Sequence, residues 1–173
     1  MWTRLIRLFK HRWQSDAATR LAIPPELRQR LAEQVKQSEA SHSGEIRIYV
    51  EAGLPLSYLW QTASTAQITR QRALSLFGKL GVWDTEHNNG VLIYLLLAER
   101  RIEIVADRGL NARITPDTWP RLIQSMQTCF KAGDFEKGLT QAVQEISALL
   151  HQHFALLPEQ GNPNELPDAP ILT

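Results

Sequence analysis

Residues 82–97, VWDTEHNNGVLIYLLL, join a polar loop directly to the most apolar run of the chain. Three residues further on, residues 101–106 (RIEIVA) alternate polar and apolar side chains before Asp107. A run that is apolar on both faces is typical of a central strand covered by helices, and alternation is typical of a strand with one buried face. The two runs therefore predict a β-hairpin with a polar rim.

A third strand is predicted upstream, over residues 45–51 (EIRIYVE), where Ile46, Ile48 and Val50 share one face. Between it and residue 91 the sequence predicts a long helix over about residues 58–80, with Gly81 as its C-cap. A helix that connects two strands of one sheet favours a right-handed crossover, so we expect these two strands to be parallel neighbours.

Three more helices are predicted from apolar periodicity and caps. They cover about residues 26–40, residues 117–131 with Asp117 as N-cap, and residues 134–154. Four prolines and the acidic residues after position 155 predict an irregular tail over residues 156–173. The expected organisation is an N-terminal helical segment (1–22), one α/β domain (23–155) and this tail.

The N-terminal segment, WTRLIRLFKHRW at residues 2–13, places apolar residues at helical spacing and basic residues largely around the other side. Five basic residues and one acidic residue fall within residues 1–20. Such a helix either packs on its own domain, lies on an anionic membrane surface, or binds a protein partner. We predict a protein or membrane-surface partner through residues 1–20.

Amino-acid composition indicates which broad class of protein the chain belongs to. The chain has 173 residues, 43% of them hydrophobic and 21% charged, and a formal net charge of +1, as expected of a soluble globular domain without affinity for nucleic acid. A single cysteine, Cys129, excludes an internal disulfide and a cysteine-based zinc cluster. No run approaches the roughly 18 apolar residues of a membrane span, and no signal peptide is apparent. We predict a cytoplasmic protein, peripheral at the inner face of the membrane if the helix binds lipid.

The connectivity predicts where polar residues meet. The first two strands are expected to be parallel, and the second and third to form a hairpin. The starts of the first two strands and the end of the third should therefore lie at one edge of the sheet. The polar residues expected there are Glu45, Asp84, Glu86, Asn88, Asn89, Asp107, Arg108 and Asp117. Open α/β sheets usually bind ligands at the opposite edge, here near Glu51 and Ala98, but that edge offers fewer polar groups. The polar edge is therefore the predicted site.

Several short motifs carry a family resemblance. They are Asn88-Asn89-Gly90-Val91-Leu92-Ile93, Arg101-Ile102-Glu103-Ile104, Gly109-Leu110, and Phe130 with Gly133-Asp134-Phe135 and Gly138. Together they resemble the TPM domain, the family of thylakoid acid phosphatase-like, photosystem II repair and nematode receptor-modulating proteins. The resemblance covers about residues 24–155. Residues 82–110 and the closing NELPD motif at 164–168 are similar to a small bacterial branch without an export signal.

The resemblance implies an α/β fold, a compact three-layer sandwich with a mixed sheet of three to four strands between helices, consistent with the predicted elements. It also implies acid phosphatase activity or divalent-cation binding, which are associated with some members. Two departures stand out. Asn88 replaces an aspartate that many members carry before the Asn-Gly pair, and Asp107-Arg108-Gly109-Leu110 replaces a glycine-tyrosine-glycine-leucine stretch.

Oxygen-bearing side chains make the polar edge a candidate site for Ca²⁺ or Mg²⁺. The candidate ligands are Asp84, Glu86, Asn88, Asn89 and Asp107. Their loop is not an EF-hand, because Gly90 comes one place late and Leu95 stands where the bidentate glutamate belongs. In the alternative reading, Asn89-Gly90 makes a tight turn, Asp84 caps backbone N–H groups and Asp107 pairs with Arg108.

Three functions are compatible with these patterns: a binding or adaptor module, a divalent-cation-binding module, and a weak metal-dependent acid phosphatase. A phosphatase would use Arg108 and a metal-bound water. His87 is then either a proton donor or a solvated loop residue. We also predict that Arg47 and Glu103 form a cross-strand ion pair.

Overall fold

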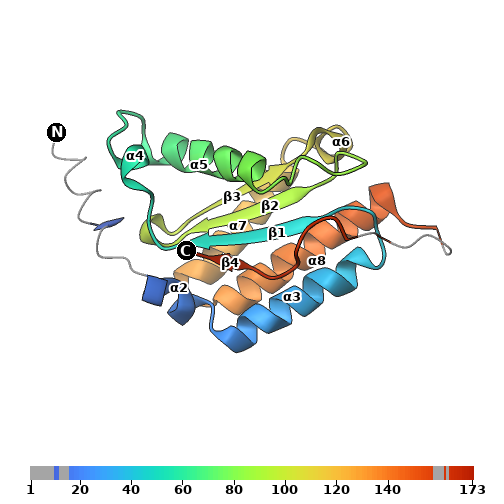
Figure 1. Cartoon of the computed structure of the whole chain (residues 1–173), viewed down its shortest axis with the longest axis horizontal. Helices are drawn as coiled ribbons and strands as arrows, with labels where there is room; N and C mark the ends of the chain where they lie inside the picture. Colours follow the sequence, from blue (N-terminus) through green and yellow to red (C-terminus); the bar gives the residue numbers. More distant parts are fainter. Residues whose placement is uncertain (1–9, 12–15, 158–161, 163) are drawn as a thin grey trace.

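A four-stranded mixed sheet, in the order β3-β2-β1-β4, forms the middle layer of the molecule (Figure 1). The structure, a computed structural model, describes residues 10–11, 16–157, 162 and 164–173. The strands are β1 (Ile46–Glu51), β2 (Val91–Leu96), β3 (Arg101–Ala106) and β4 (Ile171–Leu172). β1 and β2 are parallel, β2 and β3 are antiparallel, and both pairings confirm the prediction.

Helices cover both faces of the sheet, which gives the predicted three-layer sandwich (Figure 1). One face carries α4 (Leu56–Leu59) and α5 (Thr65–Lys79), and the other carries α3 (Pro25–Glu39), α7 (Thr118–Lys131) and α8 (Phe135–Phe154). The short helices α2 (Asp16–Ala22) and α6 (Arg108–Asn111) lie outside these layers at opposite ends of the sheet.

β2 has the central place that its apolar sequence predicts. Val91, Ile93 and Leu95 belong to the core cluster shared with α3, α7 and α8. Leu92 and Tyr94 belong to the second cluster, under α5. Every residue of β2 is buried, so strand alternation here separates two apolar faces rather than an apolar and a polar one.

The helix predicted over residues 58–80 is instead two helices, α4 and α5. Ser64 starts α5 with a capping box: its hydroxyl accepts the N–H of Gln67, and the Gln67 side chain accepts the N–H of Ser64. The sequence carried this signal as Ser-x-x-Gln. The prediction of one continuous helix was wrong because the cap stops α5 from extending backwards.

The tail predicted as irregular contributes the fourth strand. β4 pairs in parallel with β1, with Tyr49 opposite Ile171 and Val50 opposite Leu172. Backbone bonds extend the ladder by one residue, since Thr173 donates its N–H to Val50 and accepts the N–H of Ala52. The tail therefore covers the outer edge of β1.

The helix predicted over residues 2–13 falls almost wholly outside the described residues. Lys10 and His11 are described, and both are helical. After residue 15 the chain continues as α2. Within the part of the chain that the structure describes, no helix has the length and apolar character needed to cross a bilayer.

Candidate functional site

The loop that enters β2 is closely packed against its own backbone. We call this end of the sheet, with residues 81–90 and 107–109, the loop end; it lies to the right in Figure 1. Gly90 is required there because a Cβ atom would collide with the carbonyl oxygen of Val82. Asn89 donates its N–H to the Thr85 hydroxyl at 3.0 Å. The loop is held as a compact turn by these short-range contacts.

The loop end also joins β2 to the end of β3. Asn88 has a left-handed backbone, with φ of 52°, and its carbonyl accepts the N–H of Gly109 at 2.9 Å. The Asn88 side-chain oxygen accepts Nε of Arg108 at 3.0 Å. Asp107 donates its N–H to Gly90 at 2.9 Å. The predicted meeting of these two segments therefore occurs, and Arg108 is committed to holding Asn88.

Two oxygens at the loop end are buried without a hydrogen-bond partner among the described residues: Oδ1 of Asn89 and Oδ2 of Asp107. The other atoms of both side chains are engaged. Asn89 donates Nδ2 to the Ser43 hydroxyl at 3.1 Å, and Asp107 Oδ1 accepts the N–H of Arg108 at 2.6 Å. A buried acceptor without a donor costs free energy, so these oxygens are where a cation or water would be stabilising.

The other predicted residues of the polar edge do not complete a set of metal ligands in the described structure. Asp84 and Glu86 are exposed. Asp117 is exposed and pairs with Arg121 on its own helix, 3.1 Å away. Nowhere in the described ranges do three His, Cys, Asp or Glu side chains come together to hold a metal ion. The loop end thus offers two free oxygens rather than a closed ligand cage, which fits only a weakly held, largely hydrated cation.

Glu45 belongs to the loop end but binds the tail instead of the loop. Its carboxylate, only 1% exposed, accepts the backbone N–H groups of Glu165 and Leu166 at 3.1 and 3.2 Å. Beside it, Glu39 caps the first N–H of β1, that of Ile46, at 2.9 Å. Burial, reinforced by the charge of Glu45, raises the pKa of Glu39 to about 9.

Arg47 completes this buried group, which sequence analysis did not identify. The side chain is 5% exposed, and its Nε and Nη1 atoms have no hydrogen-bond partner in the described structure. Burial lowers the pKa of Arg47, although Asp168, Glu39 and Glu45 act against that by their charges. The predicted pair of Arg47 with Glu103 was wrong, because β2 lies between their strands. Glu103 instead pairs with Arg70 of α5, at 3.4 Å.

Comparison with known families decides the identity of the fold. A sequence model described as the TPM domain matches residues 19–149, about three quarters of the chain. The chain belongs to the TPM domain family. Its solved relatives include the BA42 protein of the psychrophilic bacterium Bizionia argentinensis, with 26% identity and a TM-score of 0.70 over 86% of this chain and 94% of that one. A search among curated proteins found no match.

A second solved structure, the N-terminal domain of a protein from P. gingivalis, shares 23% identity with this TPM domain. Its TM-score is 0.56, and the match covers 77% of this chain and 81% of that one. At this identity the likeness concerns the fold alone. Both relatives therefore support the α/β sandwich, and neither assigns a reaction.

The opposite end of the TPM domain holds a buried ion pair that sequence analysis missed. We call this the hairpin end, because the β2–β3 turn (residues 97–100) lies there, to the left in Figure 1. Arg72 of α5 donates Nε and Nη2 to the two oxygens of Glu51, at 3.0 and 2.6 Å. Tyr94 donates its hydroxyl to the same carboxylate at 2.6 Å. Both carboxylate oxygens of Glu51 accept hydrogen bonds, so we interpret this ion pair as one that stabilises the fold.

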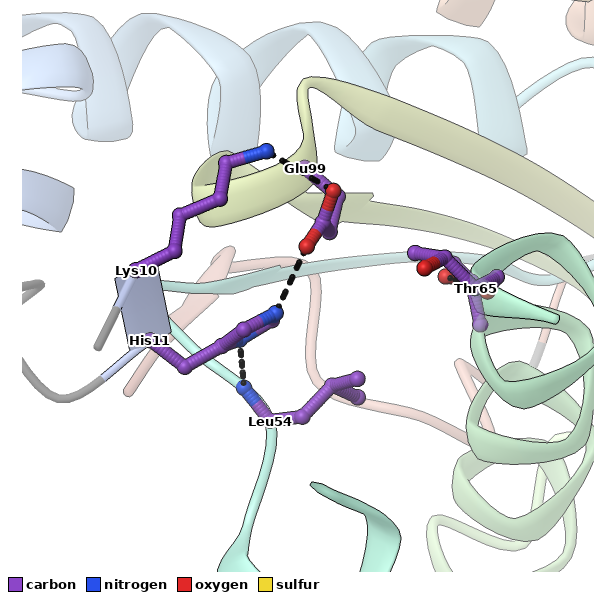
Figure 2. Close-up of polar contacts among 6 residues, drawn as sticks. Lys10, His11, Leu54, Thr65 and Glu99 are labelled. Carbon is purple, nitrogen blue, oxygen red and sulfur yellow. Dashed lines mark hydrogen bonds and ion pairs between the residues drawn. The ribbon is translucent and has the colours of Figure 1, made fainter. Parts of the chain in front are cut away.

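His11, which is 4% exposed, lies at the hairpin end (Figure 2). Its Nδ1 atom accepts the N–H of Leu54 at 2.9 Å, so the ring proton lies on Nε2, which donates to Glu99 at 2.9 Å. Lys10 donates to the other Glu99 oxygen at 2.8 Å. Burial would raise the pKa of Glu99, but these two hydrogen bonds outweigh it and hold that pKa below its usual value.

Proposed function

We propose that this TPM domain is a peripheral adaptor that docks its hairpin end on an anionic membrane surface. The observation that carries the proposal is a pair of exposed apolar side chains on and beside α4. Leu56 is 59% exposed and Trp60 is 64% exposed. The segment just before them, Gly53 and Leu54, is where His11 is seated. Lys10 and His11 of the basic N-terminal segment and the exposed pair therefore share one end of the molecule.

The charges at this end favour the same partner. Arg100 is exposed and Arg101 half-buried in the β2–β3 turn and the start of β3, close to Lys10. Tryptophan is enriched at membrane interfaces, and each basic residue near an anionic surface contributes about 1 kcal/mol of attraction. Leu56 and Trp60 would enter the interface while the basic residues contact headgroups. This assigns the N-terminal segment a role in membrane docking.

Vesicle sedimentation tests the proposal with a matched control. The double variant Leu56→Ser, Trp60→Ser should bind phosphatidylcholine vesicles containing phosphatidylglycerol about tenfold more weakly than the natural sequence. The control is Leu74→Ser, Trp83→Ser, which removes the same residue types at similar exposure, 48% and 53%, on and just beyond α5. Added salt should weaken binding of the natural sequence, because screening reduces attraction to the anionic surface.

Two results would contradict the membrane proposal. The first is a natural chain that does not sediment with anionic vesicles at low salt. The second is an equal loss of binding in both double variants, which would show that no particular face is used.

A second candidate function, binding of a divalent cation at the loop end, is favoured by the unpartnered oxygens of Asn89 and Asp107. Titration with Ca²⁺ or Mg²⁺ should shift the amide NMR signals of residues 84–89 and of Asp107 together. Asp107→Ala should remove those shifts without unfolding the chain. Signals in these residues that stay fixed at millimolar cation would reject the site.

The phosphatase alternative uses a metal-bound water at the Asp84 and Asp107 carboxylates, with Arg108 to stabilise phosphoryl charge. Arg108 lies at the loop end as this chemistry needs, although its Nε atom is bound to Asn88. Hydrolysis of an aryl phosphate should then require metal and be abolished by both Asp84→Ala and Asp107→Ala. Activity that survives both substitutions comes from another protein in the preparation.

A further inference from the structure

An apolar groove of about 730 Å³ opens at the hairpin end, on the face opposite α4. Its lining comes from four separate parts of the chain: α2, the start of α3, the end of β2 with the turn after it, and the α7–α8 connection. Leu27, Leu95 and Phe130 contribute from the core, and Leu21 on α2 is 85% exposed. The volume is in the range that holds a small apolar ligand.

One lining residue, Arg100, has an uncommon conformation. Its backbone is left-handed, with φ of 49° and ψ of 42°, in the turn after β2. Side chains larger than asparagine are disfavoured in this region, where glycine is relaxed. The turn therefore carries backbone strain that glycine, which has no Cβ atom, would relieve, and strain of this kind is often retained for a role in binding.

Arg100 also supplies a cation that the groove does not neutralise. In the described structure no acidic side chain forms an ion pair with it: of the two acidic lining residues, Glu136 is paired with Arg30, and Asp134 caps a helix. Asp134 accepts the N–H of Lys137 at the start of α8, and Glu136 accepts two hydrogen bonds from Arg30 at 2.8 Å. An apolar groove with one free guanidinium is complementary to an apolar chain that ends in an anionic group.

We propose that this groove binds the acyl chain of an anionic membrane lipid, with Arg100 on the carboxylate or phosphate of the headgroup. The inference rests on the membrane docking proposed above and names its lipid partner. Arg100 adjoins Glu99, to which Lys10 and His11 bind, so the groove opens at the same end as the proposed membrane surface. The groove therefore lies at the end of the molecule that would face the bilayer.

The test uses the full chain, dodecanoate below its micelle-forming concentration, and anionic vesicles. Dodecanoate should shift the methyl NMR signals of Leu27 and Leu95 in the natural sequence. Arg100→Gly should weaken dodecanoate binding at least tenfold while raising the melting temperature by about 2 °C, because glycine relieves the left-handed backbone. Loss of binding in a more stable protein cannot be attributed to unfolding.

Two further variants complete the test. Ala18→Phe projects a larger side chain into the groove from α2 and should weaken both dodecanoate and vesicle binding. Lys79→Gln removes an exposed positive charge from the end of α5, which does not line the groove, and should leave dodecanoate binding within twofold of the natural sequence.

The outcomes separate this inference from the membrane proposal. Unchanged dodecanoate binding in Arg100→Gly and Ala18→Phe would overturn the groove, even if Leu56 and Trp60 still bind vesicles. Methyl signals that do not respond to dodecanoate would overturn it as well. Dodecanoate binding that both variants lose, without vesicle binding by the natural chain, would support the groove and reject docking on a bilayer.

Discussion

Glu39 shows how the fold sets the charge of a single residue. It ends α3, is 4% exposed, and accepts the first N–H of β1 through one carboxyl oxygen. Burial and the neighbouring Glu45 raise its pKa from 4.5 to about 9, so the folded protein keeps this side chain neutral near pH 7. The unfolded chain releases the same proton near pH 4.5. Folding is therefore coupled to proton binding over that interval.

We predict that the free energy of unfolding falls as pH rises between about 5 and 9, and that Glu39→Gln removes much of this dependence. Each pH unit between the unfolded and folded pKa values corresponds to about 1.4 kcal/mol, so at pH 8, about 3.5 units above the unfolded value, the variant should be more stable by up to about 5 kcal/mol. Urea unfolding across the pH range measures the difference. Parallel curves for the two proteins would contradict the prediction.

His42 makes the free energy of unfolding depend on pH in the opposite direction, at acid pH. Burial lowers its pKa from 6.5 to about 4, so the folded protein holds it neutral. Its contribution to stability is present above pH 6.5 and is lost as pH falls toward 4. Glu39→Gln should not change this loss of stability at acid pH, which serves as an internal control.

Single residues of the candidate site were predictable only in part. Asn89 and Asp107 were expected at the polar edge because connectivity alone places strand ends, and both have a free oxygen there. Glu39, Arg47 and Asp168 were not expected as a group, because Asp168 reaches the other two only when the tail returns along β1. No local pattern in the sequence encodes that return.

At the level of elements, α5 is attached to the sheet by charge as well as by apolar packing. Arg72 faces inward with 8% exposure, where it binds Glu51 of β1 and lies 5.4 Å from the ring of Tyr58. Tyr94 of β2 binds the same carboxylate. One helix and two strands therefore share a single buried ion pair.

We expect Arg72→Met to lower the free energy of unfolding by about 3–5 kcal/mol, because it leaves Glu51 buried without its counter-charge. Adding Glu51→Gln should restore part of the loss, since glutamine is neutral and can still accept the Tyr94 hydroxyl. Arg30→Met is the control. Its exposed pair with Glu136 should contribute less than about 1 kcal/mol. Chemical denaturation compares the four proteins; equal losses in Arg72→Met and Arg30→Met would refute this account.

The periodicity of apolar residues predicts most of the helices and strands, but it does not predict the break between α4 and α5 or the strand β4. β1, β2 and β3 follow from alternation or apolar runs, and α3, α7 and α8 from their apolar stripes, because these signals are local. Ser64 and Gln67 form a capping box that marks the break between α4 and α5. The apolar periodicity on both sides of the break nevertheless predicts one continuous helix. β4, with two residues, is too short for any periodic signal and forms only by pairing with β1.

At the scale of the whole molecule, the tail fastens the outer edge of the sheet. Glu45 binds its backbone at residues 165 and 166, Arg28 binds the carbonyl of Pro170 at 2.9 Å, and β4 pairs with β1. The side chains of Ile171 and Leu172 pack on opposite core clusters. The tail therefore seals the sandwich along one side.

We predict that Ile171→Asp with Leu172→Asp detaches the end of the tail while the sandwich stays folded. The amide of Ala52, which donates to Thr173, should then exchange with solvent much faster. The amide of Ile46, held by Glu39, and that of Val91, held by the Glu45 carbonyl, should remain protected. Hydrogen exchange read by NMR resolves these positions. Uniform exchange at all three would mean global unfolding and would contradict a local seal.

Covering β1 in this way has a consequence for how copies of the chain behave together. An open strand edge is a template on which a neighbouring chain can add its own strand, and repeated addition leads to fibres or amorphous aggregates. The Glu39 carboxyl and β4 occupy hydrogen-bonding groups along that edge from Ile46 to Ala52. The last dozen residues thus act as a guard against self-association, and colloidal stability in concentrated solution depends on their staying in place.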